Sequence, residues 1–245
     1  MSLETIILAA GKGTRMKSDL PKVLHPVSGK SMIEHVLDVA DQAGVDKHCV
    51  VAGFKKDLVI ESLSDRNNVT YAIQKEQNGT ASAVLCAKDA ICDMDSTLLI
   101  LCGDTPLLKS ETIKKFVDIY KDGEAGIIVL SCDFEDSNGY GRIVRKDGKF
   151  VKIQEDKDCS DQEKKIKEIN TGIYLGKASI VFEALNLVQN NNAQKEYYLT
   201  DILTIAQDKG YRVESIAMGQ EDEFLGVNSK DQLEVAEKVL SERNN

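Results

Sequence analysis

The sequence predicts an α/β protein whose mainly parallel, Rossmann-like sheet is covered by helices on both faces. Short apolar runs alternate with amphipathic stretches along most of the 245 residues. The runs are continuously apolar, which is typical of parallel strands buried on both faces. A hydrophobic content of 42% and a charged content of 29% are ordinary for a globular domain. We therefore expect one continuous α/β domain.

Strands and helices alternate strictly through the first half of the chain. Ser31 followed by Glu34 is a capping box, which predicts a helix that Gly44 closes. The other expected helices are 57–63, 80–90 and 110–120. The expected strands are 5–10, 49–52, 69–73, 98–102 and 125–132.

The rhythm changes after Asp133. The Asp147-Gly148 pair between two strand-like runs predicts a β-hairpin over 142–154, within an insertion near 133–170. The polar stretch 155–167 is expected to be mobile. The remaining expected elements are strands at 171–175 and 212–217 and helices at 178–187, 199–207 and 229–243. We find no internal repeat, and in particular no hexapeptide repeat.

A glycine-rich basic segment, 11–30, follows the first strand. Gly11 and Gly13 allow a tight turn that brings backbone N–H groups toward one point. The segment holds five Lys or Arg residues, Arg15 and Lys22 among them, against one Asp, whereas the whole chain carries −9. This local basicity favours a small polyphosphate ligand. The acidic balance elsewhere argues against a nucleic-acid partner, which needs a broad basic face.

Two familiar phosphate-binding loops do not fit this segment. A dinucleotide fingerprint requires a third glycine where Met16 stands. A Walker A motif ending at Gly29-Lys30-Ser31 requires its first glycine at Leu24. A Gly-x-Gly turn can also be no more than a turn, but the strand before it and the cations after it favour phosphate binding.

The cysteines, the histidines and the apolar segments indicate the cellular compartment and whether zinc or a membrane is involved. The six cysteines form no C-x-x-C pair, which favours free thiols in a reducing cytoplasm. The three histidines lack metal-ligand spacing, so zinc is not expected. No signal peptide or membrane span is visible. We expect a cytoplasmic protein without a membrane partner, and the sequence leaves the oligomeric state open.

An acidic residue, Asp104, follows the apolar strand 98–102. Ligands of open α/β sheets lie beyond the carboxyl ends of the strands, so Gly11 and Asp104 should reach the same edge. Mg²⁺ prefers one or two carboxylates together with phosphate oxygens and water. Asp104 is therefore a candidate magnesium ligand, and the alternative is a helix or turn cap.

Leu8 to Met16, followed by Asp19 to His25, closely resembles the signature of the sugar-1-phosphate nucleotidyltransferases. Within that family, the chain is most similar to the uridyltransferase domains of bifunctional N-acetylglucosamine-1-phosphate uridyltransferase/glucosamine-1-phosphate acetyltransferases. The resemblance recurs in the same order at 74–80, 103–106, 138–142, 168–172, 190–201 and 226–228. It therefore covers nearly the whole chain.

The resemblance implies a fold of the nucleotide-diphospho-sugar transferase type and a magnesium-dependent reaction. UTP and N-acetylglucosamine 1-phosphate would give pyrophosphate and UDP-N-acetylglucosamine, a precursor for peptidoglycan of the cell wall. Residues 1–228 would form the nucleotidyltransferase domain and 229–245 a linker-like helix. The bifunctional members continue into a β-helix of hexapeptide repeats. Because this chain shows none, acetyltransferase activity is not implied, and both a truncated bifunctional enzyme and a naturally single-domain one stay open.

The resemblance also assigns roles to individual residues. It implies that Arg15 meets the leaving β- and γ-phosphates, that Lys22 meets the α-phosphate and the sugar phosphate, and that Asp104 and Asn228 hold Mg²⁺. The implied nucleotide-binding residues are Leu8, Ala9, Ala10, Gly11, Gly13, Thr14, Gln74, Gly79 and Thr80. The implied sugar-binding residues are Gly141, Glu155, Asn170 and Thr200.

Several alternatives stay open. Gln74 could be a solvated polar residue rather than a reader of uracil, and Tyr197 and Tyr198 could be core aromatics. The chain has Ala81-Ser82 where similar family members have Gly-His, which leaves the detail near the base open. The enzyme could use another base or sugar, or the protein could be a non-catalytic nucleotide-sugar sensor.

Overall fold

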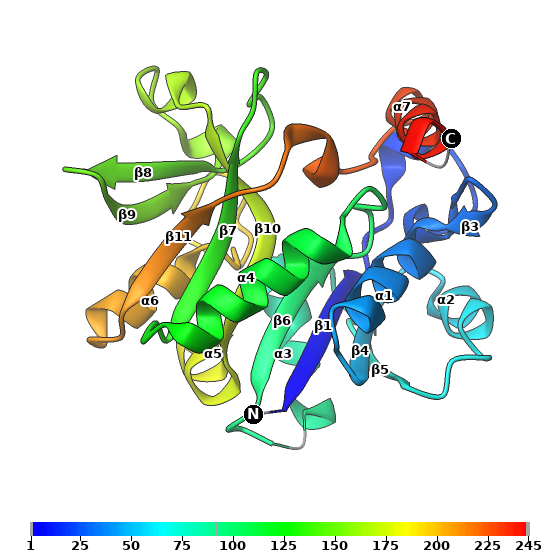
Figure 1. Ribbon diagram of the computed structural model, residues 1–245, viewed down its shortest axis with the longest axis horizontal. Coiled ribbons are helices and arrows are strands. Elements are labelled where there is room, and N and C mark those ends of the chain that lie inside the picture. Colours follow the sequence, from blue (N-terminus) through cyan, green and yellow to red (C-terminus); the bar gives the residue numbers. More distant parts are fainter. Residues whose placement is uncertain (1, 92, 244–245) are drawn as a thin grey trace.

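A computed structural model describes residues 2–91 and 93–243, and nine of its strands form one central sheet (Figure 1). The strands of this sheet are β1 (Leu3–Ala9), β4 (Lys47–Ala52), β5 (Val69–Ile73), β6 (Thr97–Cys102), β7 (Ile127–Asp133), β8 (Arg142–Lys146), β9 (Lys149–Gln154), β10 (Glu168–Lys177) and β11 (Val213–Ala217). The order across the sheet is β11-β7-β10-β6-β1-β4-β5, with β8 and β9 attached beside β10. A separate short ribbon pairs β2 (Pro26–Val27) with β3 (Lys30–Ser31).

The sheet is mainly parallel, as predicted. Strand β1 pairs in parallel with both β4 and β6, and β5 and β11 add further parallel pairs. Strand β10 differs, because it runs antiparallel to both β6 and β7. It is also longer than the predicted 171–175. The hairpin insertion between β7 and β10 accounts for this reversal, since it lets the chain turn back and pair with β7 in the antiparallel direction.

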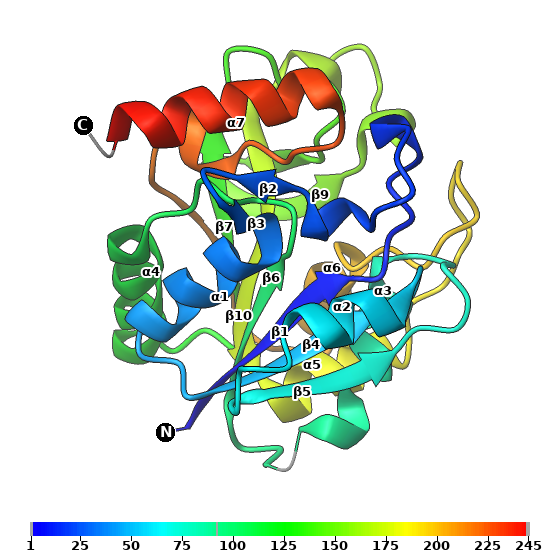
Figure 2. The ribbon, with the colours of Figure 1, turned by 90° about the vertical axis from the view of Figure 1, so that its right-hand side faces the viewer.

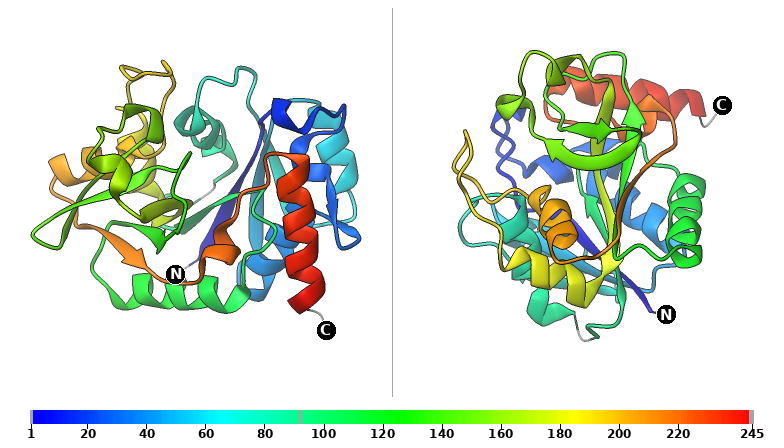
Figure 3. Two further views of the ribbon diagram at one scale, coloured as in Figure 1. Left: turned by 90° about the horizontal axis from the view of Figure 1, so that it is seen from above. Right: turned by 90° about the vertical axis from the view of Figure 1, so that its left-hand side faces the viewer.

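Helices cover both faces of the sheet, also as predicted (Figure 1, Figure 3). One face carries α1 (Met32–Gln42), α2 (Lys56–Ser62) and α4 (Ser110–Asp122). The other face carries α3 (Thr80–Cys86), α5 (Ala178–Leu185) and α6 (Asp201–Asp208). Each layer has its own core of buried apolar side chains.

The apolar runs follow from this two-sided cover. Successive side chains of a strand point to opposite faces. In β1, Ile6 belongs to the core on the face of α3, α5 and α6, whereas Ile7 belongs to the core on the face of α1, α2 and α4, and both are fully buried. A strand in this position needs apolar residues at consecutive positions, which explains why the runs do not alternate. The predicted capping box is present, and Glu34 accepts a hydrogen bond from the Ser31 backbone at 2.9 Å.

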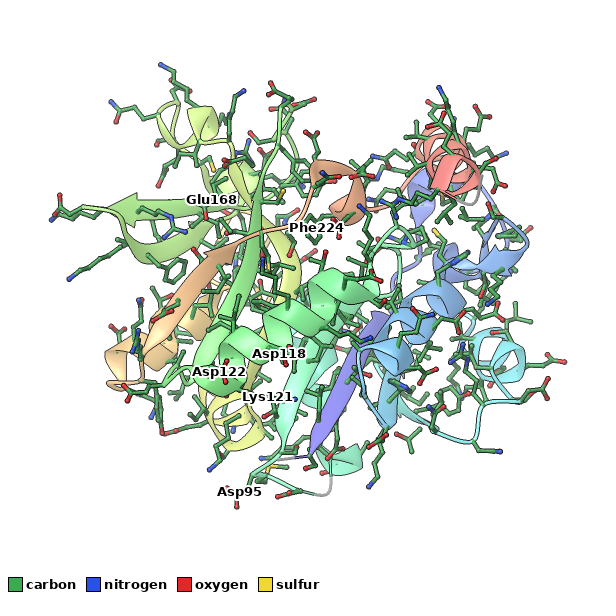
Figure 4. The ribbon with its side chains drawn as sticks, viewed as in Figure 1. Asp95, Asp118, Lys121, Asp122, Glu168 and Phe224 are labelled. Carbon is green, nitrogen blue, oxygen red and sulfur yellow. The ribbon has the colours of Figure 1, made fainter. Side chains whose placement is uncertain are left out.

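The predicted hairpin consists of β8 and β9. Asp147 (φ 51°) and Gly148 (φ 76°) both have left-handed backbones, as a two-residue hairpin turn of this kind requires. Arg145 joins the hairpin to β10 through an ion pair of 2.6 Å with Glu168, which Figure 4 labels at the base of the hairpin. The following stretch 155–167 contains two short 3-10 turns, and its mobility stays a prediction.

The last helix, α7 (Lys230–Arg243), packs against one end of the molecule, far from the hairpin (Figure 1, Figure 2). Its Ala236 is buried against Val27, Leu107 and Val227. The Arg243 guanidinium donates a hydrogen bond of 2.6 Å to the Leu107 carbonyl. The predicted helix is therefore present. No helix in the described ranges is both long and apolar enough to cross a membrane.

The cysteines of the described ranges are free thiols. Cys49 and Cys132 are buried, whereas Cys86 is exposed. The described thiols are Cys49, Cys86, Cys102, Cys132 and Cys159. Cys92 lies outside the described residues.

The middle of the sheet should contribute most to stability. Ile100 is 1% exposed and pairs with Ile6 on β1 and Tyr174 on β10. Ile100→Ala is expected to lower the free energy of unfolding by about 2–5 kcal/mol, because it removes buried methylene groups and leaves a cavity. Val235→Ala, at a position on α7 that is 50% exposed, is expected to change it by less than about 0.5 kcal/mol. Denaturant unfolding measures both, and equal losses would contradict this placement of the core.

Candidate active site

The carboxyl ends of the parallel strands meet at one edge of the sheet. In Figure 2 the dark blue segment after β1 lies beyond the arrowhead of that strand. The Gly103 backbone donates to the Leu8 carbonyl at 2.9 Å, so the turns after β1 and β6 lie side by side. The Gln74 backbone donates to the Ala52 carbonyl at 2.9 Å, which brings the end of β5 to the same edge. Because β10 runs the other way, its first residues reach this edge too.

A pocket of about 310 Å³ opens at this edge. It brings together these residues predicted from the sequence: Leu8, Ala9, Ala10, Gly11, Lys22, Gln74, Gly79, Thr80 and Asp104. The sequence did not predict the other lining residues, which are Val23, Gln77, Ala83, Cys102 and Glu196. The resulting cavity has small and apolar walls with a few polar groups, which is typical of a small-molecule site.

Lys22 is the central cation of the pocket. Its ammonium forms an ion pair with the Asp104 carboxylate and donates a hydrogen bond of 2.8 Å to Asn228 Oδ1. The side chains of Lys22 and Asp104 are only 15% and 18% exposed. The Val227 backbone donates to the Asp104 carbonyl at 2.9 Å, which brings the segment before α7 to the end of β6. Three residues far apart in the chain therefore converge at one positive charge.

The orientation of the Asn228 amide follows from its second contact. Asn228 Nδ2 donates to the Gly226 carbonyl at 3.2 Å, and a carbonyl can only accept. The oxygen of the amide therefore faces Lys22. Both groups around the ammonium are hard oxygen donors, one charged and one neutral.

These two oxygens also fit the predicted magnesium ion. The Lys22 ammonium shows that a cation is accepted between them, and Mg²⁺ takes one or two protein oxygens with phosphate and water. Within the described ranges no group of three or more His, Cys, Asp or Glu side chains is placed to hold a metal. Asp104 and Asn228 could therefore hold Mg²⁺ only if the ligand completes the coordination.

The glycine turn makes room for the lysine. A Cβ on Gly13 would lie 2.6 Å from Lys22 Cβ, and Gly13 has φ +62°. Gly13, Thr14 and Arg15 do not line the pocket, and their predicted contacts with the nucleotide stay predictions. Arg15 is exposed on a 3-10 turn and makes no ion pair with any residue that the structure describes.

Arg15 nevertheless lies on the same side of the molecule as Asp104. Burial raises the pKa of the Tyr140 hydroxyl, the negative charge of Asp104 adds to the rise, and the positive charge of Arg15 opposes it. Both charges are therefore near enough to act on one hydroxyl. An exposed cation in this position is available to an anionic ligand.

Gln74 is buried, which excludes the alternative that it is simply a solvated residue. It is 5% exposed, and its Nε2 donates to the Gly79 carbonyl at 3.1 Å. Gly79 has φ +127°, and a Cβ there would lie 2.5 Å from the backbone nitrogen of Tyr197. The backbone of Tyr197, rather than its ring, therefore supports the turn. Thr80 Oγ1 completes this support by accepting a hydrogen bond of 3.0 Å from the Leu199 backbone.

The four predicted sugar-binding residues lie outside the lining of this pocket and form two pairs. The Asn170 backbone donates to the Gly141 carbonyl at 2.8 Å, and Thr200 Oγ1 donates to Glu155 Oε1 at 3.0 Å. Asn170 Nδ2 also donates to the Tyr174 hydroxyl at 2.9 Å. Glu155 lines a neighbouring pocket of about 290 Å³. Burial raises the pKa of its carboxyl, and the Thr200 hydroxyl opposes that rise.

Tyr174 contacts Asn170, one of the predicted sugar-binding residues, and Cys102 lines the pocket at the strand ends. Sequence reasoning missed both. Burial raises the pKa of Tyr174, and the charge of Glu155 adds to it, so these groups lie near each other. Burial and then the Asp104 charge raise the pKa of Cys102 to about 12, so this thiol stays protonated and is no nucleophile at neutral pH. Both residues lie in strongly apolar strand sequences. The sequence feature that could have indicated them is their position near strand ends at the ligand edge.

A strand-edge pocket with a glycine turn, a basic segment, one carboxylate oxygen and one amide oxygen fits a nucleotidyltransferase. The family described as MobA-like NTP transferase domain matches residues 5–198, and the chain belongs to that family. It is 46% identical to the bifunctional protein GlmU of Clostridioides difficile, over 100% of this chain and 53% of that protein. It is 45% identical to the same-named protein of an Exiguobacterium species, over 98% and 53%. The chain thus spans about half the length of the curated relatives it matches.

Solved structures share the fold. A Bacillus anthracis protein described as a glucose-1-phosphate thymidylyltransferase, crystallised with sucrose, aligns with a TM-score of 0.80 at 23% identity, over 97% of this chain and 95% of that one. A UDP-glucose pyrophosphorylase complexed with UDP-glucose aligns with a TM-score of 0.78 at 20% identity, over 99% and 100%. The predicted nucleotide-diphospho-sugar transferase fold is confirmed.

The support of the Gly79 turn by Tyr197 leads to a test. Gly79→Ala is expected to displace the 77–80 turn from the backbone of Tyr197 and to weaken nucleotide binding at least about tenfold, since the contact leaves no room for a Cβ. Gly148→Ala is the control, because Gly148 also has positive φ (+76°) but open space around it. Calorimetric titration with UTP measures both. Equal affinity in the two variants would show that the turn is not part of the site.

Proposed function

We propose that this chain transfers a uridylyl group from UTP to N-acetylglucosamine 1-phosphate, giving UDP-N-acetylglucosamine and pyrophosphate. The observation that supports this most is the convergence of Lys22, Asp104 and Asn228 beside the glycine turn and the buried Gln74. The similarity to GlmU proteins over the whole chain adds to it. On this proposal residues 1–228 carry the catalytic machinery and the helix that follows is an attached element.

The reaction requires that the two substrates are aligned and that their negative charges are neutralised. The attacking phosphate oxygen is already ionised at neutral pH, so the site needs no general base. Two anions must approach each other, and negative charge builds up on the α-phosphoryl group and the leaving pyrophosphate. Arg15 and Lys22 are the cations of this chain assigned to that charge, together with the backbone amides of the glycine turn.

Asp104 and Asn228 would hold magnesium, and the ion would supply positive charge that neutralises part of the charge of the phosphates. With the charge of Asp104 compensated in this way, Lys22 would be free to meet the phosphate instead. Its flexible four-carbon stem allows the ammonium to swing toward the α-phosphate. Lys22 would thus keep the Asp104 carboxylate neutralised before the substrate arrives and meet the phosphate afterwards.

The base and the sugar would be selected by buried polar groups. Gln74 and the Gly79–Thr80 turn would read the uracil edge. Glu155, Asn170 and Thr200, with the Gly141 backbone, would bind the hydroxyl and acetamido groups of the sugar. Such groups reject a wrong substrate because it leaves them buried without a partner.

A substrate panel tests this function. The four ribonucleoside triphosphates and dTTP are each combined with N-acetylglucosamine 1-phosphate, glucosamine 1-phosphate and glucose 1-phosphate, and pyrophosphate release is measured. The highest turnover is expected with UTP and N-acetylglucosamine 1-phosphate, and EDTA is expected to abolish it. A stronger pair elsewhere in the panel would replace the substrate assignment, and binding of UDP-sugars without turnover would indicate a sensor.

The assigned cations lead to a second prediction. Lys22→Ala and Arg15→Ala are each expected to lower turnover by about 10²–10³-fold, since each removes a donor to charge that develops during the reaction. Lys30→Ala is the matched control from the same basic segment, because Lys30 is 56% exposed and pairs with Asp38 on the surface. Steady-state kinetics on folded protein, checked by thermal unfolding, decide. Turnover near the wild-type level in both variants would refute the assigned roles.

A further inference from the structure

The Ser82 side chain contacts the Gln74 side chain. Ser82 belongs to the Ala81-Ser82 pair, at which this sequence differs from similar family members. Its Oγ is 2.8 Å from Gln74 Nε2 and 3.0 Å from the Gly79 carbonyl, and it also donates to Asn78 Oδ1. Ser82 does not line the nucleotide pocket. It lines a separate cavity of about 350 Å³, together with Asn78 and Tyr197.

The Gly79 carbonyl determines the direction of this hydrogen-bond chain. A carbonyl only accepts, so the Gln74 atom that contacts it must be the amide nitrogen. Ser82 Oγ, 2.8 Å away, accepts from the same nitrogen. Since Ser82 is the acceptor in this contact, its own hydroxyl proton is free to go to Asn78. The chain of donors therefore runs from Gln74 through Ser82 to Asn78.

The Gln74 amide thus faces two acceptors inside the protein with its nitrogen, namely the Gly79 carbonyl and Ser82 Oγ. Its Oε1 has no partner among residues 2–91 and 93–243, and Gln74 lines the nucleotide pocket. The atom of this side chain that is left for a ligand is an acceptor.

We propose that Ser82 is a positioning residue for base selection, which holds the Gln74 amide so that only its carbonyl oxygen is offered to the base. The inference rests on the proposed transfer from a uridine nucleotide. Uracil presents an N–H donor at ring position 3, which a lone acceptor satisfies. In the same pose cytosine presents a lone pair at this position, which repels the acceptor. Thymine has the same edge as uracil, so Ser82 does not separate these two bases.

Removing the hydroxyl should release the amide. In Ser82→Ala the Gln74 nitrogen loses one of its two acceptors and keeps only the Gly79 carbonyl, so the amide is held less firmly and its oxygen is offered to the base less often. The preference for UTP over CTP in kcat/KM is expected to fall about threefold to tenfold, the range for one neutral hydrogen bond. The KM for UTP is expected to rise by a similar factor, with kcat within about twofold of the wild type and the UTP/dTTP ratio unchanged.

Three further variants complete the experiment. Ser82→Thr keeps a hydroxyl at a position that lines the neighbouring cavity, and it is expected to restore the preference. Ser82→Cys keeps the size of the side chain with a weak acceptor and is expected to behave like Ser82→Ala, so it also serves if the alanine variant folds poorly. Ser62→Ala removes a hydroxyl on α2 that binds only the Val59 carbonyl, and no change is expected.

The outcomes separate the two proposals. A UTP preference that stays at the wild-type level in both Ser82→Ala and Ser82→Cys overturns the role of Ser82 while the proposed function stands. A loss that Ser82→Thr does not restore also overturns it, because the effect then does not depend on the hydroxyl. A wild-type enzyme without preference for UTP over CTP contradicts the uridine assignment itself, and this inference falls with it.

Discussion

The site is organised by a constraint on charge: the carboxylate of Asp104 is too buried to remain without a cation. Removing one partner of a partly buried ion pair leaves an uncompensated charge, which is far more costly than losing a surface pair. Lys22 supplies the positive charge, and Asn228 adds a neutral oxygen to it. These two contacts of Lys22 connect the basic segment after β1, the end of β6 and the chain before α7. The glycine at position 13 is required because the stem of Lys22 occupies the space of a side chain there.

The architecture of the sheet explains why these segments can meet. The parallel strands β1, β4, β5 and β6 end at one edge, and their following turns carry the glycines, Gln74 and Asp104. The reversed strand β10 brings Asn170 to that edge from the opposite direction, and Tyr174 lies behind it. The residues proposed to bind the nucleotide therefore come from strand ends, and those proposed to bind the sugar come mainly from the start of β10 and the hairpin insertion.

Much of this could be predicted from the sequence because it depends on local rules. The consecutive apolar residues Ile6 and Ile7 indicate a strand buried on both faces, and Asp147-Gly148 indicates a hairpin. The common edge of Gly11 and Asp104 follows from parallel strands. The direction of β10 could not be predicted from the sequence. It depends on which strands β10 pairs with, and this long-range pairing is not encoded in any local pattern.

The contacts within the site were beyond sequence reasoning for the same reason. Lys22 and Asp104 were assigned to separate partners, a phosphate and a metal ion, and the structure pairs them with each other. Ser82 was noticed only as a departure from similar family members. Its contact with Gln74 spans the end of one strand and the next helix, and only the fold shows that the two side chains meet. Arg15, by contrast, stays exposed, and its role depends on the ligand.

A crystal structure with UTP and magnesium would test the account most directly. The account predicts the triphosphate on the turn from Gly11 to Gly13, a metal ion between Asp104 and Asn228, and the Lys22 ammonium moved from these oxygens onto the phosphate. A triphosphate bound elsewhere, with Lys22 still paired with Asp104 and the glycine turn empty, would contradict it.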